Sequence, residues 1–397
     1  GTYSAIVNYS CVYGNDYTGT GNIKIDPKFV DKNSDWHLKP GSPCIDAGNG
    51  DVATATDLDN NSRYDDFSII NTGTGNPNYV DMGAYECQQN SPMHGTFNIG
   101  ASAPIFHSFQ QAVDSMLNLS IDGAVTFTVQ TGTYNEQVTL PGVVGESETN
   151  TITFQSATGD STDVILTYAS TDQNNNYTLK LDSADYVTFK GITLQATGTT
   201  YARIVELDHG ACSNIFTNNQ FLGLANTSEL VHSDRLGTET ESPDTSNSFL
   251  NNRFENGAVG ISFTSVITGT GTTVENNEFI NQSDTAVYFK YFSHSKILSN
   301  YIHSNSPSTG IYLTQLSDGD TISNNIIQLN AGGNGINLYY CYKTSSDTNL
   351  ISNNFVYLNT INSDHGINIY YTSTAIKLLN NTVHITGDSS GSYCLYY

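Results

Sequence analysis

The sequence is poor in charged residues, and in basic ones above all. Only 13% of its 397 residues are Asp, Glu, Lys or Arg, whereas soluble proteins average roughly 25%. The 14 Lys and Arg residues stand against 38 Asp and Glu residues, so the formal net charge is −24. Because such a surface repels phosphate, the composition disfavours a nucleic-acid-binding protein.

Long apolar segments and closely spaced cysteines are also missing. No apolar segment approaches the roughly 18 residues of a membrane-spanning helix. The six cysteines form no CxxC pair and have no histidines at zinc-site intervals, which disfavours a metal cluster. Two interpretations of the cysteines stay open: isolated buried thiols, or one disulfide between Cys44 and Cys87 in the N-terminal segment.

Residues that favour strands and turns are abundant instead. Aromatic residues make up 11% of the chain, with 25 Tyr, and there are 34 Gly. Aromatic and β-branched residues favour strands, whereas Gly, Asn, Asp and Ser favour turns. The composition therefore predicts an all-β protein and disfavours disorder.

A short Asn-containing phrase recurs from about residue 210 onward. Apolar residues stand three places before and two places after its Asn, and a second phrase with alternating apolar residues follows each time. A unit of about 25 residues cannot bury its apolar face alone, so it must stack on copies of itself. We therefore predict a β-solenoid in which this Asn column makes left-handed turns and bonds from coil to coil, with Gly191 in the same column. The column comprises Asn219, Asn252, Asn277, Asn300, Asn325, Asn354 and Asn381.

Residues 97–124 have the pattern of a cap that covers the first coil. Ser108 and Gln111 form a capping-box pattern, and apolar residues then follow with helical periodicity as far as Leu117. We expect a short α-helix at about 108–119 and coils over 125–397, with the last repeat incomplete. Glu136 is expected to be a structural hydrogen-bond acceptor near the cap rather than a catalytic acid.

The helix pattern, FTVQTGTYNEQVTL (127–140) and DYVTFKGITL (185–194) together resemble the start of pectin-lyase-type right-handed parallel β-helix proteins. GTYNE (132–136) resembles the first motif of pectin methylesterases. The chain from about 95 onward is similar to large surface proteins exported by type IX secretion. Residues 1–93, with DWHLKPGSPCIDAGN and VDMGAYE, resemble the closing module of another β-helix, of the choice-of-anchor type.

The resemblance implies two tandem β-helix modules, the end of one over 1–93 and a second over 94–397. They would belong to a longer bacterial protein that is secreted or held at the cell surface. The later motifs of pectin methylesterases, polygalacturonases and pectate lyases are absent, so we lean against an enzyme. We expect a non-enzymatic stalk or adhesin with a wall that binds glycans or surfaces. A polysaccharide lyase or hydrolase and a purely structural spacer are the alternatives, and an Asp/Lys/Arg or calcium cluster on one wall would favour the enzyme.

Tyrosine supplies the candidate ligand-binding residues. Strand alternation turns one tyrosine column outward in the last coils, with Tyr396 and Tyr397 expected in the same two places as Tyr370 and Tyr371. The rings could merely stack on one another, or they could form a platform for sugar rings or a protein partner. The candidates are Tyr288, Tyr312, Tyr339, Tyr340, Tyr370 and Tyr371.

Two acidic segments are candidate calcium sites. Asp57, Asp59, Asn61 and Asp65 place oxygen ligands as in the first half of a calcium loop, and calcium is the one cofactor the sequence suggests. The alternative there is a charge-paired turn around Arg63. The acidic insertion 229–244 has three interpretations: a solvated loop, a calcium or partner site, or the wall of an active site.

Overall fold

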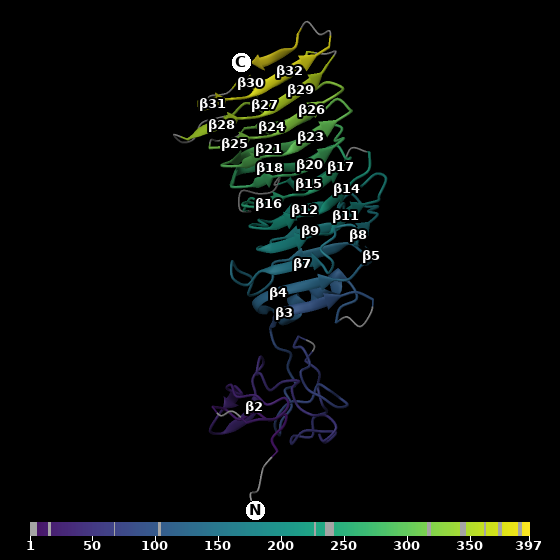
Figure 1. Cartoon of the computed structure of the whole chain (residues 1–397), viewed down its shortest axis with the longest axis vertical. Helices are drawn as coiled ribbons and strands as arrows, with labels where there is room; N and C mark the ends of the chain where they lie inside the picture. Colours follow the sequence, from purple (N-terminus) through teal and green to yellow (C-terminus); the bar gives the residue numbers. More distant parts are fainter. Residues whose placement is uncertain are drawn as a thin grey trace, which may run out of the picture. The chain divides into compact units, whose positions relative to one another are not determined.

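The chain divides into two compact units, Gly1–Gly95 with Ser115–Gly123, and Thr96–Asp114 with Ala124–Tyr397. That they correspond to two tandem modules stays a prediction. The computed structural model (Figure 1) describes residues 6–14, 17–66, 68–101, 105–225, 228–234, 242–315, 319–341, 347–360, 363–371, 375–387 and 391–397.

The N-terminal unit consists mostly of turns around a small core. Strands β1 (Phe29–Asp31) and β2 (Asp35–Leu38) form its antiparallel pair. All six cysteines are free, so of the two interpretations the structure has isolated thiols. Cys44 and Cys87 lie in the core of this unit, which gathers Leu38, Cys44, Ile45, Ala47, Met82 and Cys87.

The second unit winds through three parallel sheets, which we call sheets A, B and C. Sheet A contains β3 (Met93–Ile99), β4 (Ile121–Val129), β7 (Ile152–Ser156), β10 (Val187–Lys190), β13 (Ile215–Thr217), β16 (Ser248–Leu250), β19 (Thr273–Glu275), β22 (Lys296–Leu298), β25 (Thr321–Ser323), β28 (Thr348–Ser352) and β31 (Ala375–Leu379). Sheet B contains β5 (Gly132–Asn135), β8 (Val164–Tyr168), β11 (Thr193–Ala196), β14 (Gln220–Leu222), β17 (Arg253–Glu255), β20 (Glu278–Ile280), β23 (Tyr301–Ser304), β26 (Ile326–Leu329), β29 (Phe355–Asn359) and β32 (Thr382–Thr386). Sheet C contains β6 (Val138–Pro141), β9 (Leu179–Asp182), β12 (Val205–Asp208), β15 (Glu229–Asp234), β18 (Val259–Thr270), β21 (Thr285–Ser293), β24 (Thr309–Thr314), β27 (Ile336–Tyr339), β30 (His365–Tyr370) and β33 (Tyr393–Tyr396).

Each coil contributes one strand to each sheet, and each strand pairs with the matching strand of the next coil. Figure 1 shows these strands stacked one above another. This arrangement is a parallel β-helix of about ten coils, which confirms the all-β solenoid predicted from the repeat.

The core consists of columns of like residues, because the register places equivalent positions of successive coils side by side. Neighbouring rings in the sheet A column stack at 4.7 to 5.7 Å between centroids. Aliphatic residues continue the column in the later coils, starting at Val274. The rings of the sheet A column are Phe127, Phe154, Phe189, Phe216 and Phe249.

Helix α1 (Phe109–Leu119) begins where the capping box predicts. Ser108 Oγ accepts the Gln111 N–H at 3.1 Å. The two carboxylate oxygens of Glu136 accept the N–H groups of Phe109 and Gln110, at 2.9 and 3.0 Å. A carboxylate is favourable at a helix N-terminus because it meets unpaired N–H groups and the positive end of the dipole. Glu136 thus has the structural role expected of it.

One face of α1 is fully buried, by Phe109, Ala112, Val113 and Met116. Leu117, which the periodicity assigns to the same apolar stripe, is instead 41% exposed, so the buried stripe is narrower than predicted. Among the described residues, no helix has the length and apolar character needed to cross a bilayer.

Two-residue turns connect sheet A to sheet B, and their two residues have different roles. In the repeated phrase the second residue is an Asn, buried in every case but Asn381, whose side-chain amide bonds to the preceding coil. From Asn252 to Asn354 the amide also donates to the Asn of the next coil. The left-handed conformation, which the repeat pattern predicts for that same Asn, belongs instead to the exposed residue before it. These left-handed residues, with φ of 53° to 61°, are Asn218, Asn251, Asn276, Ser299, Asn324, Asn353 and Asn380.

The register corrects the placement of Gly191. Lys190 pairs with Thr217, so Gly191 stands beside Asn218, and its φ of 64° is the left-handed value of that place. Ile192 occupies the next place and donates its N–H to Asn219 Oδ1 at 2.9 Å. Gly191 therefore belongs one residue earlier than predicted, because Gly suits the left-handed place and not the bonding place.

A second set of polar bonds follows the turns from sheet C to sheet A. Asn214 Oδ1 accepts the Val187 N–H at 2.9 Å, and Asn247 Oδ1 accepts the Asn214 N–H at 3.0 Å. In later coils, Asn349 Oδ1 accepts the Asp320 N–H at 2.9 Å. This column is not recognisable in the sequence, because its residue type changes from coil to coil.

Candidate functional site

Two columns of side chains point away from the core along sheet C, because their strand neighbours such as Leu181 and Leu207 are buried. Both columns begin with charged residues; tyrosines stand in the middle coils of the first column and in the later coils of the second. The first column comprises Lys180, Glu206, His232, Ser262, Tyr288, Tyr312, Asn337 and Asn368. The second comprises Asp182 and Asp208, and further on Thr264, Lys290, Thr314, Tyr339 and Tyr370.

The charged end of this face is a connected network of ion pairs. Lys180 Nζ lies 2.7 Å from Asp208 Oδ2 and 3.4 Å from Glu206 Oε1. Arg203 Nη1 lies 3.1 Å from Glu206 Oε2, and its Nη2 lies 3.7 Å from Glu229 Oε2. We call this set the charged cluster; it comprises Lys180, Asp182, Arg203, Glu206, Asp208, His209, Glu229 and His232.

Two carboxylates and an imidazole meet at one edge of the charged cluster. His209 Nδ1 lies 2.5 Å from Asp182 Oδ1 and 3.4 Å from Asp208 Oδ2. One ligand atom from each of the three residues falls within 4.8 Å of the others, so the group has the donors for a metal ion. Sequence reasoning gives His209 a low rank and does not find this group. The available signal was the repetition of LKLD (179–182) as VELDH (205–209) one coil later.

Contacts within the cluster shift the pKa values of three of its groups, His209, Lys180 and Glu229. The hydrogen bond to Asp182 raises the pKa of His209, and the nearby carboxylates add to that effect. Burial lowers the pKa of Lys180, but Asp208 and Glu206 more than offset this, so the pKa is raised overall. Burial raises the pKa of Glu229, but the contacts with His232 and Arg203 prevail and leave it lowered. At neutral pH Lys180 is therefore a poor general base and Glu229 a poor general acid.

The other end of the face carries stacked aromatic rings, which we call the tyrosine cluster. The register confirms that Tyr339 and Tyr370 stand side by side, with ring centroids 5.7 Å apart and 7° between planes. Tyr340 and Tyr371 form a second stacked pair at 5.1 Å and 18°. The full cluster comprises Tyr288, Tyr312, Tyr339, Tyr340, Tyr370 and Tyr371.

Within the tyrosine cluster, the rings differ in how they meet and how far they are exposed. Tyr288 and Tyr312 meet edge to face at 5.3 Å. Tyr371 is 60% exposed, and the other five rings are partly buried against one another. The hydrogen bond to Tyr371 raises the pKa of Tyr370 to about 12, so this hydroxyl stays protonated. The cluster therefore offers ring faces together with hydroxyl donors.

The last coil departs from the predicted register. Tyr396 pairs with Asn368 rather than with Tyr370, two residues away from the expected place. Leu395 pairs with the buried Ile367 and is itself 49% exposed. The repeat pattern is misleading here because SYCL (392–395) matches the phrase of the earlier coils only loosely.

The acidic insertion is partly a strand. Its first six residues, Glu229–Asp234, form β15, and residues 235–241 lie outside the described part of the chain. Asp244 is buried, where it accepts the Ser233 hydroxyl at 2.6 Å and two backbone N–H groups. Burial raises its pKa to about 6 despite these bonds.

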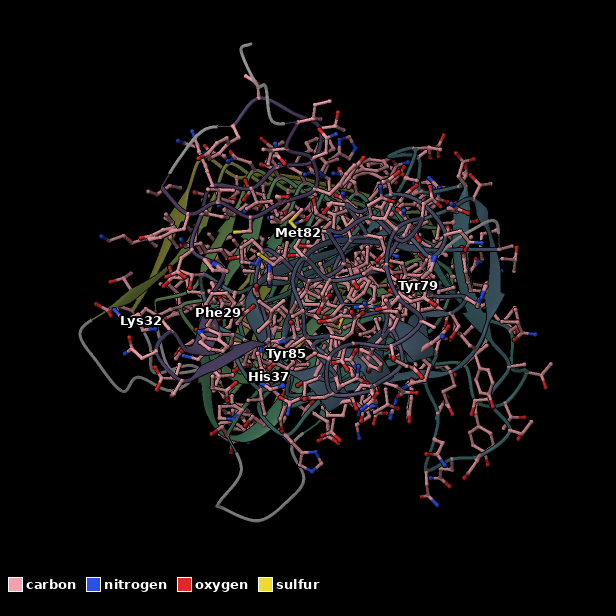
Figure 2. All side chains as sticks on the ribbon, turned by 90° about the horizontal axis from the view of Figure 1, so that it is seen from below. Phe29, Lys32, His37, Tyr79, Met82 and Tyr85 are labelled. Atoms are coloured by element: carbon pink, nitrogen blue, oxygen red, sulfur yellow. The ribbon has the colours of Figure 1, made fainter. Side chains whose placement is uncertain are left out.

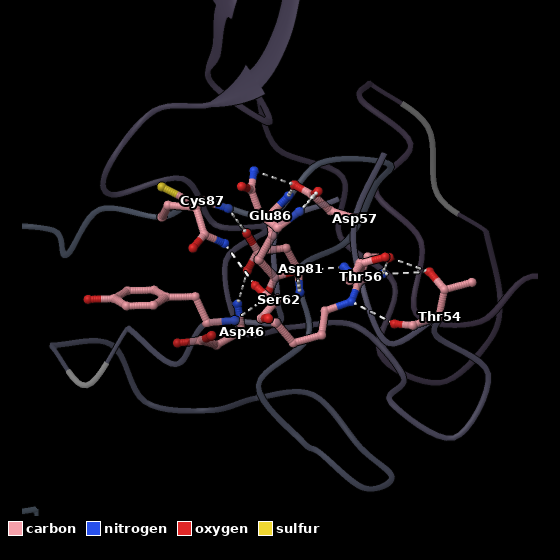
Figure 3. Close-up of polar contacts among 12 residues, drawn as sticks. Asp46, Thr54, Thr56, Asp57, Ser62, Asp81, Glu86 and Cys87 are labelled. Carbon is pink, nitrogen blue, oxygen red and sulfur yellow. Dashed lines mark hydrogen bonds and ion pairs between the residues drawn. The ribbon is translucent and has the colours of Figure 1, made fainter. Parts of the chain in front are cut away.

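The four residues of the predicted calcium loop lie in different environments (Figure 3). Asp57 turns its oxygens to the N–H groups of Asp59, Asn61 and Glu86, at 2.8 to 3.0 Å. Asp59 lies 2.7 Å from His37 Nε2. Among the described residues these four do not form a group of close ligand atoms. Calcium at this loop stays a prediction.

Arg63 makes the contacts expected of a charge-paired turn. Its Nη1 lies 2.6 Å from the buried carboxylate of Glu86. It also donates to backbone oxygens of residues 54 and 56. The turn is thus held by an ion pair whose two side chains are almost fully buried.

The N-terminal unit also contains a largely apolar pocket of about 560 Å³. Trp36, the only Trp of the chain, lines it and is 55% exposed. Figure 2 labels three residues that line this pocket, Phe29, Met82 and Tyr85. The rings of His37 and Tyr85 lie 4.1 Å apart.

Comparisons with known proteins support the fold and no more. Residues 243–395 match the family model described as "Right handed beta helix region". Among curated proteins, none matches the chain in sequence. The predicted right-handed parallel β-helix is thereby confirmed, whereas export by type IX secretion and the choice-of-anchor module stay predictions.

Several solved structures share this architecture at low similarity. Pectin methylesterase from Aspergillus niger is 13% identical with a TM-score of 0.40, over 78% of this chain and 92% of its own. Pectate lyase Pel9A is 12% identical with a TM-score of 0.36, over 75% and 80%. GH136 lacto-N-biosidase from Eubacterium ramulus is 8% identical with a TM-score of 0.43, over 74% and 68%. The family model and the three parallel sheets make the chain a right-handed parallel β-helix by fold. A fold of this kind does not define an activity.

Proposed function

We propose that this β-helix binds carbohydrate chains along the outer face of sheet C. The tyrosine cluster is the observation that carries the proposal. Sugar rings pack their C–H faces against aromatic rings, and the hydroxyls of tyrosine can bond to sugar hydroxyls. Tyr339 stacks on Tyr370 and Tyr340 on Tyr371, and edge-to-face contacts join the two stacks, so these four rings form one patch rather than isolated rings.

The charged cluster supports binding at the same face. It contains four carboxylates, two cations and two histidines, so it offers many donors and acceptors without a strong excess of positive charge. With −24 on the whole chain, acidic polymers are repelled. We therefore expect neutral glycans to bind better than polyuronates.

The test measures binding of neutral and acidic polysaccharides to the purified chain by calorimetry and affinity electrophoresis. The double variant Tyr339→Ser and Tyr370→Ser is expected to lose binding while the far-UV circular dichroism stays unchanged. Tyr357→Ser is the matched control, because this partly buried tyrosine lies on sheet B. Undiminished binding by the double variant would contradict the proposal.

A polysaccharide-cleaving enzyme is the second candidate, because Asp182, Asp208, His209 and Lys180 form an Asp/Lys/His group on one wall. Glycoside hydrolysis generally needs a pair of carboxylates, and Asp182 and Asp208 are close enough to form such a pair. Release of reducing ends or unsaturated products is measured with and without calcium. If turnover is observed and Asp208→Asn abolishes it, the protein is an enzyme and the proposal of binding alone is overturned.

We further propose that the chain is part of a longer bacterial protein that is secreted or displayed at the cell surface as a stalk or adhesin. The support is the resemblance of 1–93 to a closing β-helix module and of the chain from about 95 onward to surface proteins exported by type IX secretion. A folded chain that binds no glycan and releases no product would favour the structural spacer.

A further inference from the structure

A groove of about 1000 Å³ lies at the corner between sheets A and B, outside sheet C and its two clusters. Its floor is formed by the connecting turns of four successive coils, from β13 to β22. The exposed first residues of these turns are Asn218, Asn251, Asn276 and Ser299, all with φ of 56° or 57°. Because each of these turns has only two residues, the floor of the groove is lower than the wall formed by the longer loop 158–161.

The loop 158–161 forms one wall of the groove. Seven residues separate β7 from β8 in this coil, whereas two residues make the same connection in the later coils. The loop is held in place by Ser161, whose Oγ accepts Gln220 Nε2 at 3.0 Å and whose carbonyl accepts Thr193 Oγ1 at 2.7 Å. The wall is therefore fixed to two strands of sheet B, β11 and β14.

The amide groups on the floor are available to a ligand. The side chains of Asn218, Asn251 and Asn276 make no hydrogen bond to any described residue, although their backbone N–H groups are bonded. Each such amide offers two donors and one acceptor. The amides repeat at the coil spacing of about 4.8 Å, which is close to the length of one sugar unit.

The charges in the groove are nearly balanced. Arg253 Nη1 lies 2.6 Å from Glu278 Oε2, and the same guanidinium also contacts Glu255. Asp160, on the wall, leaves a small negative excess, which disfavours an anionic ligand. Tyr301 lines the far end of the groove and is 38% exposed, so its ring can pack against a sugar.

We propose that this groove is a second carbohydrate site, which binds an uncharged oligosaccharide lying along the helix axis. Successive sugar units contact successive coils, and their hydroxyls bond to the amides of Asn218, Asn251 and Asn276. The loop 158–161 closes the groove at its first coil. This site does not depend on the tyrosine cluster, so either can fail without the other.

The test uses the full chain and a panel of cello-, xylo- and manno-oligosaccharides of two to six units, with oligogalacturonates as the acidic comparison. The double variant Asn251→Gly and Asn276→Gly removes two amides but keeps the left-handed turns, because Gly adopts them without strain. Loss of two hydrogen bonds is expected to weaken binding about tenfold or more. Affinity should also rise with chain length up to about four units, because four coils line the groove.

The matched control is the double variant Asn353→Gly and Asn380→Gly, in the same exposed left-handed place of coils outside the groove. It is expected to bind as the unaltered chain does. Three results would overturn the inference: no binding of neutral oligosaccharides at millimolar concentration, unchanged affinity in the Asn251 and Asn276 variant, or tighter binding of oligogalacturonates. Binding that only the Tyr339 and Tyr370 variant abolishes would assign the ligand to sheet C instead.

Discussion

Asn300 provides the sharpest test of what holds the coils together. Its amide is 1% exposed and makes four hydrogen bonds. Oδ1 accepts the backbone N–H and the side-chain amide of Asn277, at 2.9 and 3.0 Å. Nδ2 donates to the Val274 carbonyl at 2.9 Å and to Asn325 Oδ1 at 3.0 Å. One side chain thus connects three successive coils.

Replacing Asn300 with Ala leaves the Asn277 N–H buried without a partner. An unsatisfied buried polar group costs about 1–3 kcal/mol, and each other lost bond contributes about 1 kcal/mol. We therefore expect the free energy of unfolding to fall by about 4–6 kcal/mol. A loss of this size is a large part of the total stability of a typical domain.

The assay is urea unfolding followed by far-UV circular dichroism. Ser299→Gly is the matched control, because it changes the exposed left-handed neighbour and should alter stability by less than about 1 kcal/mol. Asn300→Asp adds a second test. Asp places a carboxylate oxygen where the amide nitrogen of Asn300 faces the Val274 carbonyl and Asn325 Oδ1. The loss in free energy of unfolding should therefore be larger at pH 8, where the carboxyl group is ionised, than at pH 4. If the free energy of unfolding of Asn300→Ala lies within about 1 kcal/mol of that of the unaltered chain, the Asn column does not stabilise the fold as argued.

Two further predictions concern titrating groups. Burial and the charge of Asp81 raise the pKa of the fully buried Asp46 to about 9, so its contribution to stability is complete below pH 4 and is lost as pH rises through 9. The isosteric Asp46→Asn should flatten this loss, with Trp36 fluorescence reporting on the N-terminal unit; equal pH profiles would contradict the assignment. The hydrogen bond that His209 donates to Asp182 raises the pKa of His209, so this pair stabilises the fold below pH 6.5 and ceases to do so as pH rises through the higher folded value. Asp182→Asn should move the pKa of His209 back toward its ordinary value in an NMR titration, and an unmoved pKa would refute the pairing.

Periodic local patterns are enough to predict the class of fold. Apolar alternation, Asn-containing turns and a unit of about 25 residues require stacked coils, because a single unit has no core. The capping box at Ser108 and the apolar positions after it likewise determine where α1 begins. These features are local, so the residues that make them are neighbours in the sequence.

The register between coils is less accessible to sequence. The predicted places of Gly191 and Tyr396 are wrong by one residue and by two, because a repeat phrase locates a strand but not its hydrogen-bonded partner. Loop lengths vary from coil to coil, and only backbone pairing decides which residues finally stand side by side.

The repeat pattern alone is enough to predict a β-solenoid with outward tyrosines, but the stacking of the coils selects which outward residues form sites. Asp182 meets Asp208 and His209 because parallel strands place them level, one coil apart. The loop 158–161 forms a groove wall because it faces turns up to 140 residues away in the chain. These contacts follow from coil stacking, which brings together residues that lie far apart in the sequence. No local sequence pattern can therefore predict them.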